Sequence, residues 1–146
     1  MFFSSPYAAG RSAPVHAYQR TAIDVRAAQA DPHQLVVMLF DGFFEALAQA
    51  RGAMRNGDLA AKGRALGKAV SIIDEGLRAA LDLRQGGPLA RDLHDLYAYV
   101  TMRLTRANLS GDEAALDECA ELIQPLAQAW ASIRPQTQNA PQRAGA

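Results

Sequence analysis

Three histidines and one cysteine are the side chains of this chain best suited to metal binding or nucleophilic chemistry. A helical zinc site needs two histidines four residues apart, whereas His16, His33 and His94 lie far apart in the sequence. A di-iron bundle needs a Glu-x-x-His motif on two helices, and the sequence contains none. Cys119 belongs to a regularly spaced apolar stripe, where a buried thiol behaves as a small hydrophobic group. These residues therefore do not predict a metal site or a nucleophile.

Phosphate chemistry is equally poorly supported. The glycine pair Gly86-Gly87 is followed by Pro88 and lacks the Lys and the Ser or Thr of a phosphate-binding loop. We therefore expect no catalytic residue, no cofactor and no metal, and a protein that is not an enzyme.

Composition limits the partners and the compartment. The 146 residues contain 15 basic and 15 acidic side chains, so the formal net charge is zero. Nucleic acids and anionic membranes favour a basic excess, so neither is expected as a partner. No apolar run approaches the roughly 18 residues of a membrane helix, and the first 15 residues lack the layout of a secretory signal. With one cysteine and no intrachain disulfide, a cytoplasmic protein is expected.

The elements that would position any site are helices. Alanine and leucine are abundant, and apolar residues recur at spacings of three and four. The expected helices, one short and four long, cover residues 18–28, 32–55, 59–84, 89–109 and 113–133. Their short connections predict an all-α fold, an antiparallel up-down-up-down four-helix bundle preceded by a short N-terminal helix and a flexible arm.

Capping residues mark where the long helices begin. Asp31 before Pro32, Asp58 and Asp112 are each expected to accept hydrogen bonds from free amides of a first helical turn. The predicted core stripes are Leu35, Leu39, Phe43, Leu47, Ala50 and Met54; Leu66, Val70, Ile73, Leu77 and Leu81; Leu89, Leu93, Leu96, Val100 and Leu104; and Leu116, Cys119, Ile123, Leu126, Trp130 and Ile133. Around the bundle domain, residues 18–134, we expect a flexible arm at 1–17 and a disordered tail at 135–146.

More apolar residues are present than the core stripes need. The helix over residues 32–55 is apolar around nearly its whole circumference, with Phe40 and Phe44 beside its stripe. Together with Ile72 and Leu77 they predict a groove for an amphipathic segment of another protein, although Leu77 also fits a core stripe. Monomers rarely leave a large apolar patch exposed. This surface could therefore instead be covered by the first helix, the N-terminal arm or a second subunit.

Charge is distributed unevenly along the chain. Residues 51–68 carry five basic side chains and one acid, and residues 112–121 carry five acids and no base. The simpler interpretation is solvated helix faces, and the alternative is electrostatic guidance of a partner.

A segment at the start of the second helix resembles a known family. The run from Asp31-Pro32 through Leu39-Phe40-Asp41-Gly42 resembles the start of the bundle in the flagellar secretion chaperone FliS. Further matches follow in order along residues 15–133: Tyr18-Gln19, Gly57-Asp58, Lys62-Gly63, Ile72-Ile73-Asp74, Leu81-Asp82, Gly86-Gly87, Leu96-Tyr97, Arg103-Leu104, Ala107-Asn108 and Ala129-Trp130. The sequence departs from the family pattern at Asp31, where Ser is common, at Phe40, where Tyr is frequent, and over residues 1–14.

The resemblance implies a function and a set of sites. Members of this family bind the disordered C-terminal segment of flagellin in the cytoplasm, prevent its premature polymerisation and deliver it to the membrane-embedded export gate of the flagellar type III secretion apparatus. Carried over to this chain, Val15 and Tyr18 would dock on the export gate, although Tyr18 would serve equally to anchor the first helix. Phe2, Phe3 and Tyr7 would form a lid over the client groove, and a homodimer is expected when the client is absent.

Two other functions remain open at the level of the sequence. A helical-bundle adaptor or export chaperone for a different flagellar client would have the same fold and apolar surplus. A metal- or cofactor-holding bundle enzyme is disfavoured by the missing Glu-x-x-His pairs.

Overall fold

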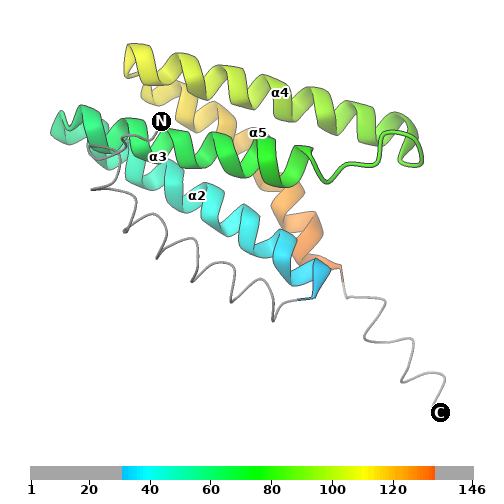
Figure 1. Ribbon diagram of the computed structural model, residues 1–146. Coiled ribbons are helices and arrows are strands. Elements are labelled where there is room, and N and C mark those ends of the chain that lie inside the picture. The colour runs from blue at the N-terminus through cyan, green and yellow to red at the C-terminus, as the bar shows by residue number, and fades with distance from the viewer. Residues whose placement is uncertain (1–30, 134–146) are drawn as a thin grey trace, which may run out of the picture. The chain divides into compact units, whose positions relative to one another are not determined.

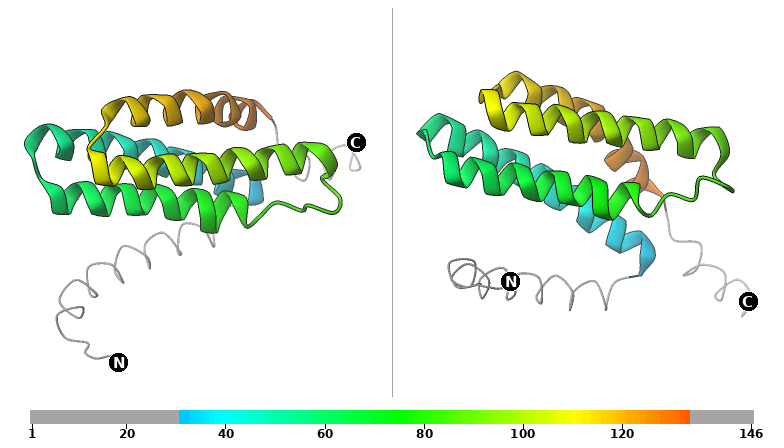
Figure 2. Two further views of the ribbon diagram at one scale, coloured as in Figure 1. Left: turned by 90° about the horizontal axis from the view of Figure 1, so that it is seen from above. Right: turned by 45° about the horizontal axis from the view of Figure 1, so that its top comes forward.

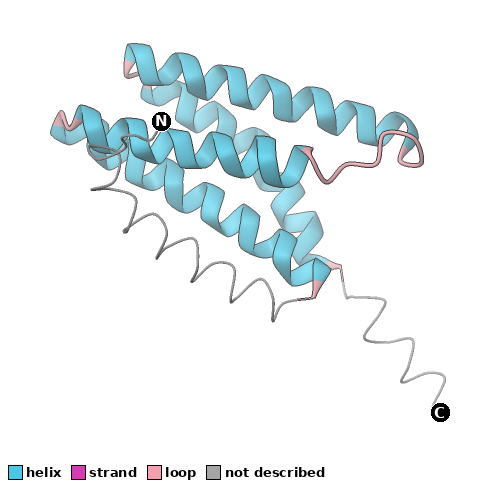
Figure 3. Ribbon diagram, viewed as in Figure 1, coloured by secondary structure: helices cyan, strands magenta, loops and turns pink. Residues whose placement is uncertain are grey.

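The computed structural model describes residues 31–133, and every regular element within this part is a helix (Figures 1 and 3). The elements are α2 at Pro32–Asn56, α3 at Leu59–Ser71, the π-helix η1 at Ile72–Arg78, α4 at Gly87–Ser110 and α5 at Glu113–Ser132. The predicted arm, short first helix and C-terminal tail lie outside the described residues. The chain divides into two compact units between Leu35 and Val36.

The predicted start of the second helix is confirmed. Pro32 is the first residue of α2, and the Asp31 carboxylate accepts a hydrogen bond from the Gln34 amide at 2.7 Å. The Asp31 carbonyl accepts a bond from the Leu35 amide at 2.9 Å. Proline has no amide hydrogen to leave unpaired, so it suits this first position.

From Val36 onward, the helices form the predicted antiparallel bundle (Figures 1 and 2). Side chains near the end of α2 pair with residues at the start of α5, so these two helices run in opposite directions. α4 lies between α3 with η1 on one side and α5 on the other. The side-chain contacts that establish these neighbours are Arg51–Glu113, Arg78–His94 and Tyr99–Glu118.

The third predicted helix is wrong in its second half. The expected α-helix to residue 84 gives way after Ser71 to η1, which ends at Arg78. Apolar spacings of three and four fit both helix types, so the sequence pattern could not reveal the change. Along η1, α2 approaches closely through two glycines: a Cβ on Gly42 would lie 3.2 Å from Ile72 Cδ1, and one on Gly76 would lie 3.2 Å from Leu39 Cδ1.

The early end of this helix follows from Asp82. Its carboxylate accepts hydrogen bonds from the amides of Arg84 and Gln85, both at 3.0 Å. An Asp side chain that bonds local amides in this way competes with helical hydrogen bonding and turns the chain. The turn closes tightly at Gly86, where a Cβ would lie 2.6 Å from the Asp82 carbonyl oxygen.

The ends of the last two helices agree with the sequence. Gly111 follows α4 with a φ of 69°, in the left-handed region that glycine tolerates. Asp112 then caps α5, because its carboxylate accepts a hydrogen bond from the Ala114 amide at 3.0 Å. Asp58 caps α3 in the same manner through the Ala61 amide.

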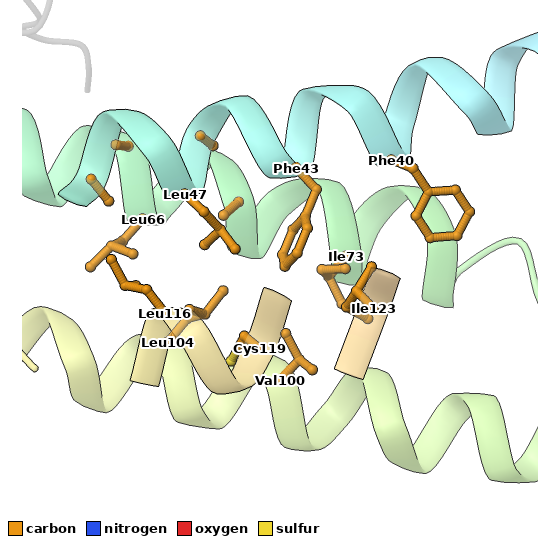
Figure 4. Packing of buried hydrophobic residues seen from close by; sticks show 14 of the residues in the cluster. Phe40, Phe43, Leu47, Leu66, Ile73, Val100, Leu104, Leu116, Cys119 and Ile123 are labelled. Carbon is orange, nitrogen blue, oxygen red and sulfur yellow. The ribbon is translucent and has the colours of Figure 1, made fainter. Parts of the chain in front are cut away.

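The core lies along the axis of the bundle and joins all of these helices (Figure 4). Large fully buried residues from each long segment meet there, and they are Phe43, Leu66, Ile73, Val100, Leu104, Leu116, Cys119 and Ile123. Each buried Leu, Ile or Phe contributes about 2 kcal/mol of transfer free energy. The fold of the described residues therefore rests on apolar packing.

The predicted stripes are only partly correct. Phe40, predicted to lie beside its stripe, and Tyr97, which is absent from the predicted stripes, are both 4% exposed and belong to the core. Conversely Leu89, predicted to be buried, is 67% exposed. Periodicity gives the direction of each side chain around its own helix, whereas burial also depends on how the neighbouring helices cross.

Candidate binding surface

The described cysteine and the histidine of α4 have structural roles. Cys119 is fully buried, as predicted, and burial raises the pKa of its thiol to about 12, which keeps it protonated and unreactive. His94 accepts a hydrogen bond at its Nε2 from Arg78 Nε at 3.2 Å. Within residues 31–133, no three His, Cys, Asp or Glu side chains gather in a way that could hold a metal ion. His16 lies outside the described residues.

Two of the four predicted groove residues are buried. Phe40 of α2 and Leu77 of η1 belong to the core, with exposed fractions of 4% and 5%. The expectation that Phe40 lies outside the core is therefore wrong. Phe40 belongs to the same buried cluster as Ile73 of η1 and Ile123 of α5, and Figure 4 shows all three between the helices.

The other two groove residues are accessible but lie on different sides of α2. Phe44 is half-buried and packs edge-on against Phe43, with ring centroids 5.4 Å apart. It lies two turns before Arg51, which reaches α5, so Phe44 is on the edge of α2 that faces α5. Ile72 is half-buried and packs at Gly42, whose direction differs by about 200° from that of Phe44. The four residues therefore do not line one groove.

The remaining predicted sites cannot be placed. The export-gate residues Val15 and Tyr18 and the lid residues Phe2, Phe3 and Tyr7 lie outside the described residues.

Many of the unevenly distributed charged residues form ion pairs between helices of the bundle. Arg51 pairs with Glu113 at 3.0 Å and also with Asp117, and Arg55 pairs with Glu113 at 3.0 Å. Hydrogen bonds from Arg55 and Arg51 lower the pKa of the Glu113 carboxyl group. The basic end of α2 and the acidic start of α5 therefore hold two helices together. This pairing accounts for much of the charge pattern without a partner.

A second group joins α4 to α5. Glu118 accepts hydrogen bonds from the Tyr99 hydroxyl and from Arg103 Nε, both at 2.6 Å, and both bonds lower the pKa of its carboxyl group. Arg103 also lies 3.7 Å from Asp112. Lys62 is 8% exposed, so this basic residue is not on a solvated face as the simpler interpretation requires.

Several apolar residues of α4 and α5 that the sequence pattern assigned to the core are accessible. Six residues of the predicted stripes near the start of α4 and the end of α5 are exposed or half-buried. They are Leu89, Leu93 and Leu96 on α4, and Leu126, Trp130 and Ile133 at the end of α5. The exposed fractions are 67% for Leu89, 36% for Trp130 and 50% for Ile133. Leu93, Leu96 and Leu126 are half-buried against the core.

A helical bundle with apolar surfaces accessible on several helices has the architecture of a protein that binds other polypeptides. No helix of residues 31–133 combines the length and the apolar character needed to span a membrane.

Comparison with known proteins agrees with this class. The family model for the flagellar protein FliS matches residues 14–137. The chain is 45% identical over 121 residues to the flagellar secretion chaperone FliS of Salmonella typhimurium, covering 83% of this chain and 90% of that protein. It is 44% identical over 116 residues to the flagellar secretion chaperone FliSB of Pseudomonas aeruginosa, covering 80% and 91%. With FliS of Bacillus subtilis the identity is 29% over 117 residues, covering 80% and 83%. The chain belongs to the FliS family of flagellar secretion chaperones.

Proposed function

We propose that this protein is a cytoplasmic chaperone that binds the disordered C-terminal segment of flagellin, prevents its premature polymerisation and delivers it to the flagellar export gate. The observation that carries the proposal is the 45% identity to a flagellar secretion chaperone across 90% of that protein. The bundle supplies a preformed apolar surface, which is what a disordered segment needs in order to fold on binding. Ordering the client has an entropic cost, and this cost keeps release at the export gate feasible.

The client contacts are proposed on α2 and η1. Phe44 and Ile72 are the accessible members of the predicted groove, one on each side of α2. A client that wraps around the bundle reaches both, whereas a single straight helix does not. Phe40 and Leu77 lie beneath them in the core, and their proposed role is to hold this surface in shape.

The N-terminal residues are proposed to have two roles. Val15 and Tyr18 dock the loaded chaperone on the export gate, and Phe2, Phe3 and Tyr7 cover the client surface when no client is bound. An uncovered apolar surface also favours self-association, so a homodimer is expected in the absence of client.

Calorimetric titration with the C-terminal region of flagellin from the same organism tests the client. We expect tight binding with a strongly negative heat-capacity change, because apolar surface becomes buried. The Phe44→Asp variant should bind at least about tenfold more weakly, since a carboxylate cannot enter an apolar contact without a large desolvation cost. The Gln49→Asp variant is the matched control, because Gln49 is exposed on the same helix.

Three outcomes separate the alternatives. Loss of binding in the folded Phe44→Asp variant and not in the control supports the site. Equal binding by the wild type and both variants would support flagellin as the client and show that the binding site does not include Phe44. No binding of flagellin by the wild type overturns the proposal in favour of a chaperone or adaptor for a different flagellar client.

A further inference from the structure

The π-helix η1 is the one element within residues 31–133 that is not an α-helix. It continues α3 without a break, because Ser71 and Ile72 both have right-handed helical dihedral angles. π-helices are rare, and they are frequent at functional sites. Gly76 in the interior of η1 weakens it further, since glycine loses more conformational freedom on folding than any other residue. After η1 the chain runs through an irregular and largely exposed connection to α4.

Polar contacts hold the end of η1 against α4. Arg78 donates a hydrogen bond from Nε to His94 Nε2 at 3.2 Å, and its guanidinium pairs with Asp74 at 2.7 Å. The exposed fractions of these side chains are 32% for Arg78, 33% for His94 and 46% for Asp74. Water can therefore replace these contacts at modest cost. The apolar anchors of η1 are its two buried residues, Ile73 and Leu77.

η1 also covers apolar side chains of α2. A Cβ on Gly76 would lie 3.2 Å from Leu39 Cδ1, so the backbone of η1 rests directly on this leucine. Phe40, the next residue of α2, is buried in the same core cluster as Ile73 and Leu77. Figure 4 shows Phe40 and Ile73 in the core between the helices. A local opening of η1 would therefore make both Leu39 and Phe40 more accessible.

We propose that η1 is a movable cover, and that its local opening exposes Leu39 and Phe40 to aliphatic side chains of the client. This inference rests on the proposed function, because the occupant is the flagellin segment, and it adds an open form to the client surface on α2 and η1. In the open form a client side chain takes the place that η1 leaves. The closed form keeps this apolar surface out of water until a client is present.

The open form has a consequence for affinity. A client that requires it binds only the fraction of molecules in which η1 is open, so its apparent affinity is reduced by that fraction. Any change that opens η1 more often should therefore tighten client binding by the same factor. A client that docks on the closed surface would show no such dependence.

Hydrogen exchange of the full chain, followed by mass spectrometry, tests whether η1 opens. We expect the amides of residues 73–78 to exchange at least about tenfold faster than those of residues 65–70 in α3, because local opening requires less free energy than global unfolding. Addition of the flagellin peptide should make exchange in η1 faster still and exchange around Leu39 and Phe40 slower. The reason is that the client holds η1 open and covers α2.

Two variants link the opening to affinity. Arg78→Met and His94→Ala each remove the hydrogen bond between η1 and α4 and leave the buried apolar residues unchanged. Each should raise exchange in η1 about two- to fivefold, as expected for partly exposed polar contacts, and should tighten flagellin binding by the same factor. The two residues lie on different helices, so agreement between the variants excludes a lost direct contact as the cause. Arg84→Met is the matched control, because Arg84 is exposed in the connection after η1.

Three results would overturn this proposal. The first is exchange in η1 that is as slow as in α3. The second is faster exchange in both variants with unchanged affinity, which would show that opening and binding are unrelated. The third is slower exchange of η1 in the complex, which would place the client on the closed surface. If neither the wild type nor any variant binds flagellin while η1 exchanges as expected, flagellin as the client is contradicted and the opening of η1 stands.

Discussion

At the scale of single residues, this protein uses its polar groups to hold helices in place. Glu118 joins Tyr99 and Arg103 of α4, and Glu113 joins Arg51 and Arg55 of α2. The two acids of α5 thereby connect it to both of its neighbours. The groups are partly exposed, so each pair contributes modestly, and their geometry serves mainly to fix which helices are adjacent.

Cys119 provides a prediction about reactivity. Burial raises the pKa of its thiol to about 12, so at pH 8 almost no thiolate exists in the folded protein. We expect iodoacetamide to leave the native protein unlabelled and to label the same cysteine fully in urea, as measured by mass spectrometry. Rapid labelling of the native protein would show that the α5 core opens often.

The same shift predicts how stability depends on pH. A thiol in the unfolded chain has a pKa of about 8.5, so above this pH the unfolded state loses its proton before the folded state does. The folded pKa is raised, so this stabilising contribution is present below about pH 8.5 and is lost as the pH rises toward 12. The free energy of unfolding, measured with urea, should therefore decrease between pH 7.5 and pH 9.5 by a smaller amount in Cys119→Ala than in the wild type.

At the scale of elements, the sequence predicted what is local and failed where tertiary packing decides. Asp31, Asp58 and Asp112 start their helices because an N-cap depends on the next three residues alone. The end of the third helix was missed because the Asp82 side chain competes with helical bonds that the apolar periodicity still permits. Neither the capping residues nor the apolar periodicity contains information on the neighbouring helices.

The candidate site illustrates this limit most clearly. Phe40 and Leu89 were assigned from their positions around their own helices, and the structure reverses both assignments. Phe40 belongs to the buried core cluster, whereas Leu89 at the start of α4 is 67% exposed. Helix crossing angles arise from the packing of whole side-chain ridges, which no single periodic pattern determines.

Two glycines give a matched prediction at this scale. No atom lies within 4 Å of the position of a Cβ on Gly67 in α3, so Gly67→Ala should stabilise the protein by about 0.5–1 kcal/mol through helix propensity. A Cβ on Gly86 would lie 2.5 Å from Ala90 Cβ and 2.6 Å from the Asp82 carbonyl oxygen. Gly86→Ala should therefore cost more than about 1 kcal/mol, because backbone must move.

Urea unfolding of both variants measures these changes against the wild type. An unchanged midpoint for Gly86→Ala would mean that the connection between η1 and α4 rearranges freely. A destabilised Gly67→Ala would mean that this outer position of α3 is covered in solution.

At the scale of the whole molecule, the proposed docking and lid residues are distinct from the core of the described bundle. Within the described residues 31–133, the buried residues of the core cluster lie between Phe40 and Ile123. The proposed export-gate residues Val15 and Tyr18 lie outside this range. The same is true of the proposed lid. Removal of both ends should therefore separate the fold from these functions.

A truncated protein of residues 31–133 tests this separation. We expect one cooperative unfolding transition in circular dichroism, because this range contains the whole core cluster of the described residues. The truncated protein should bind the flagellin peptide at least as tightly as the full chain, since a lid that competes with the client lowers the apparent affinity and is now missing. It should fail to bind the cytoplasmic domain of the export gate when loaded with client. A broad, non-cooperative transition would instead show that residues outside 31–133 complete the core, and weaker peptide binding by a folded truncation would assign part of the client site to the N-terminal residues.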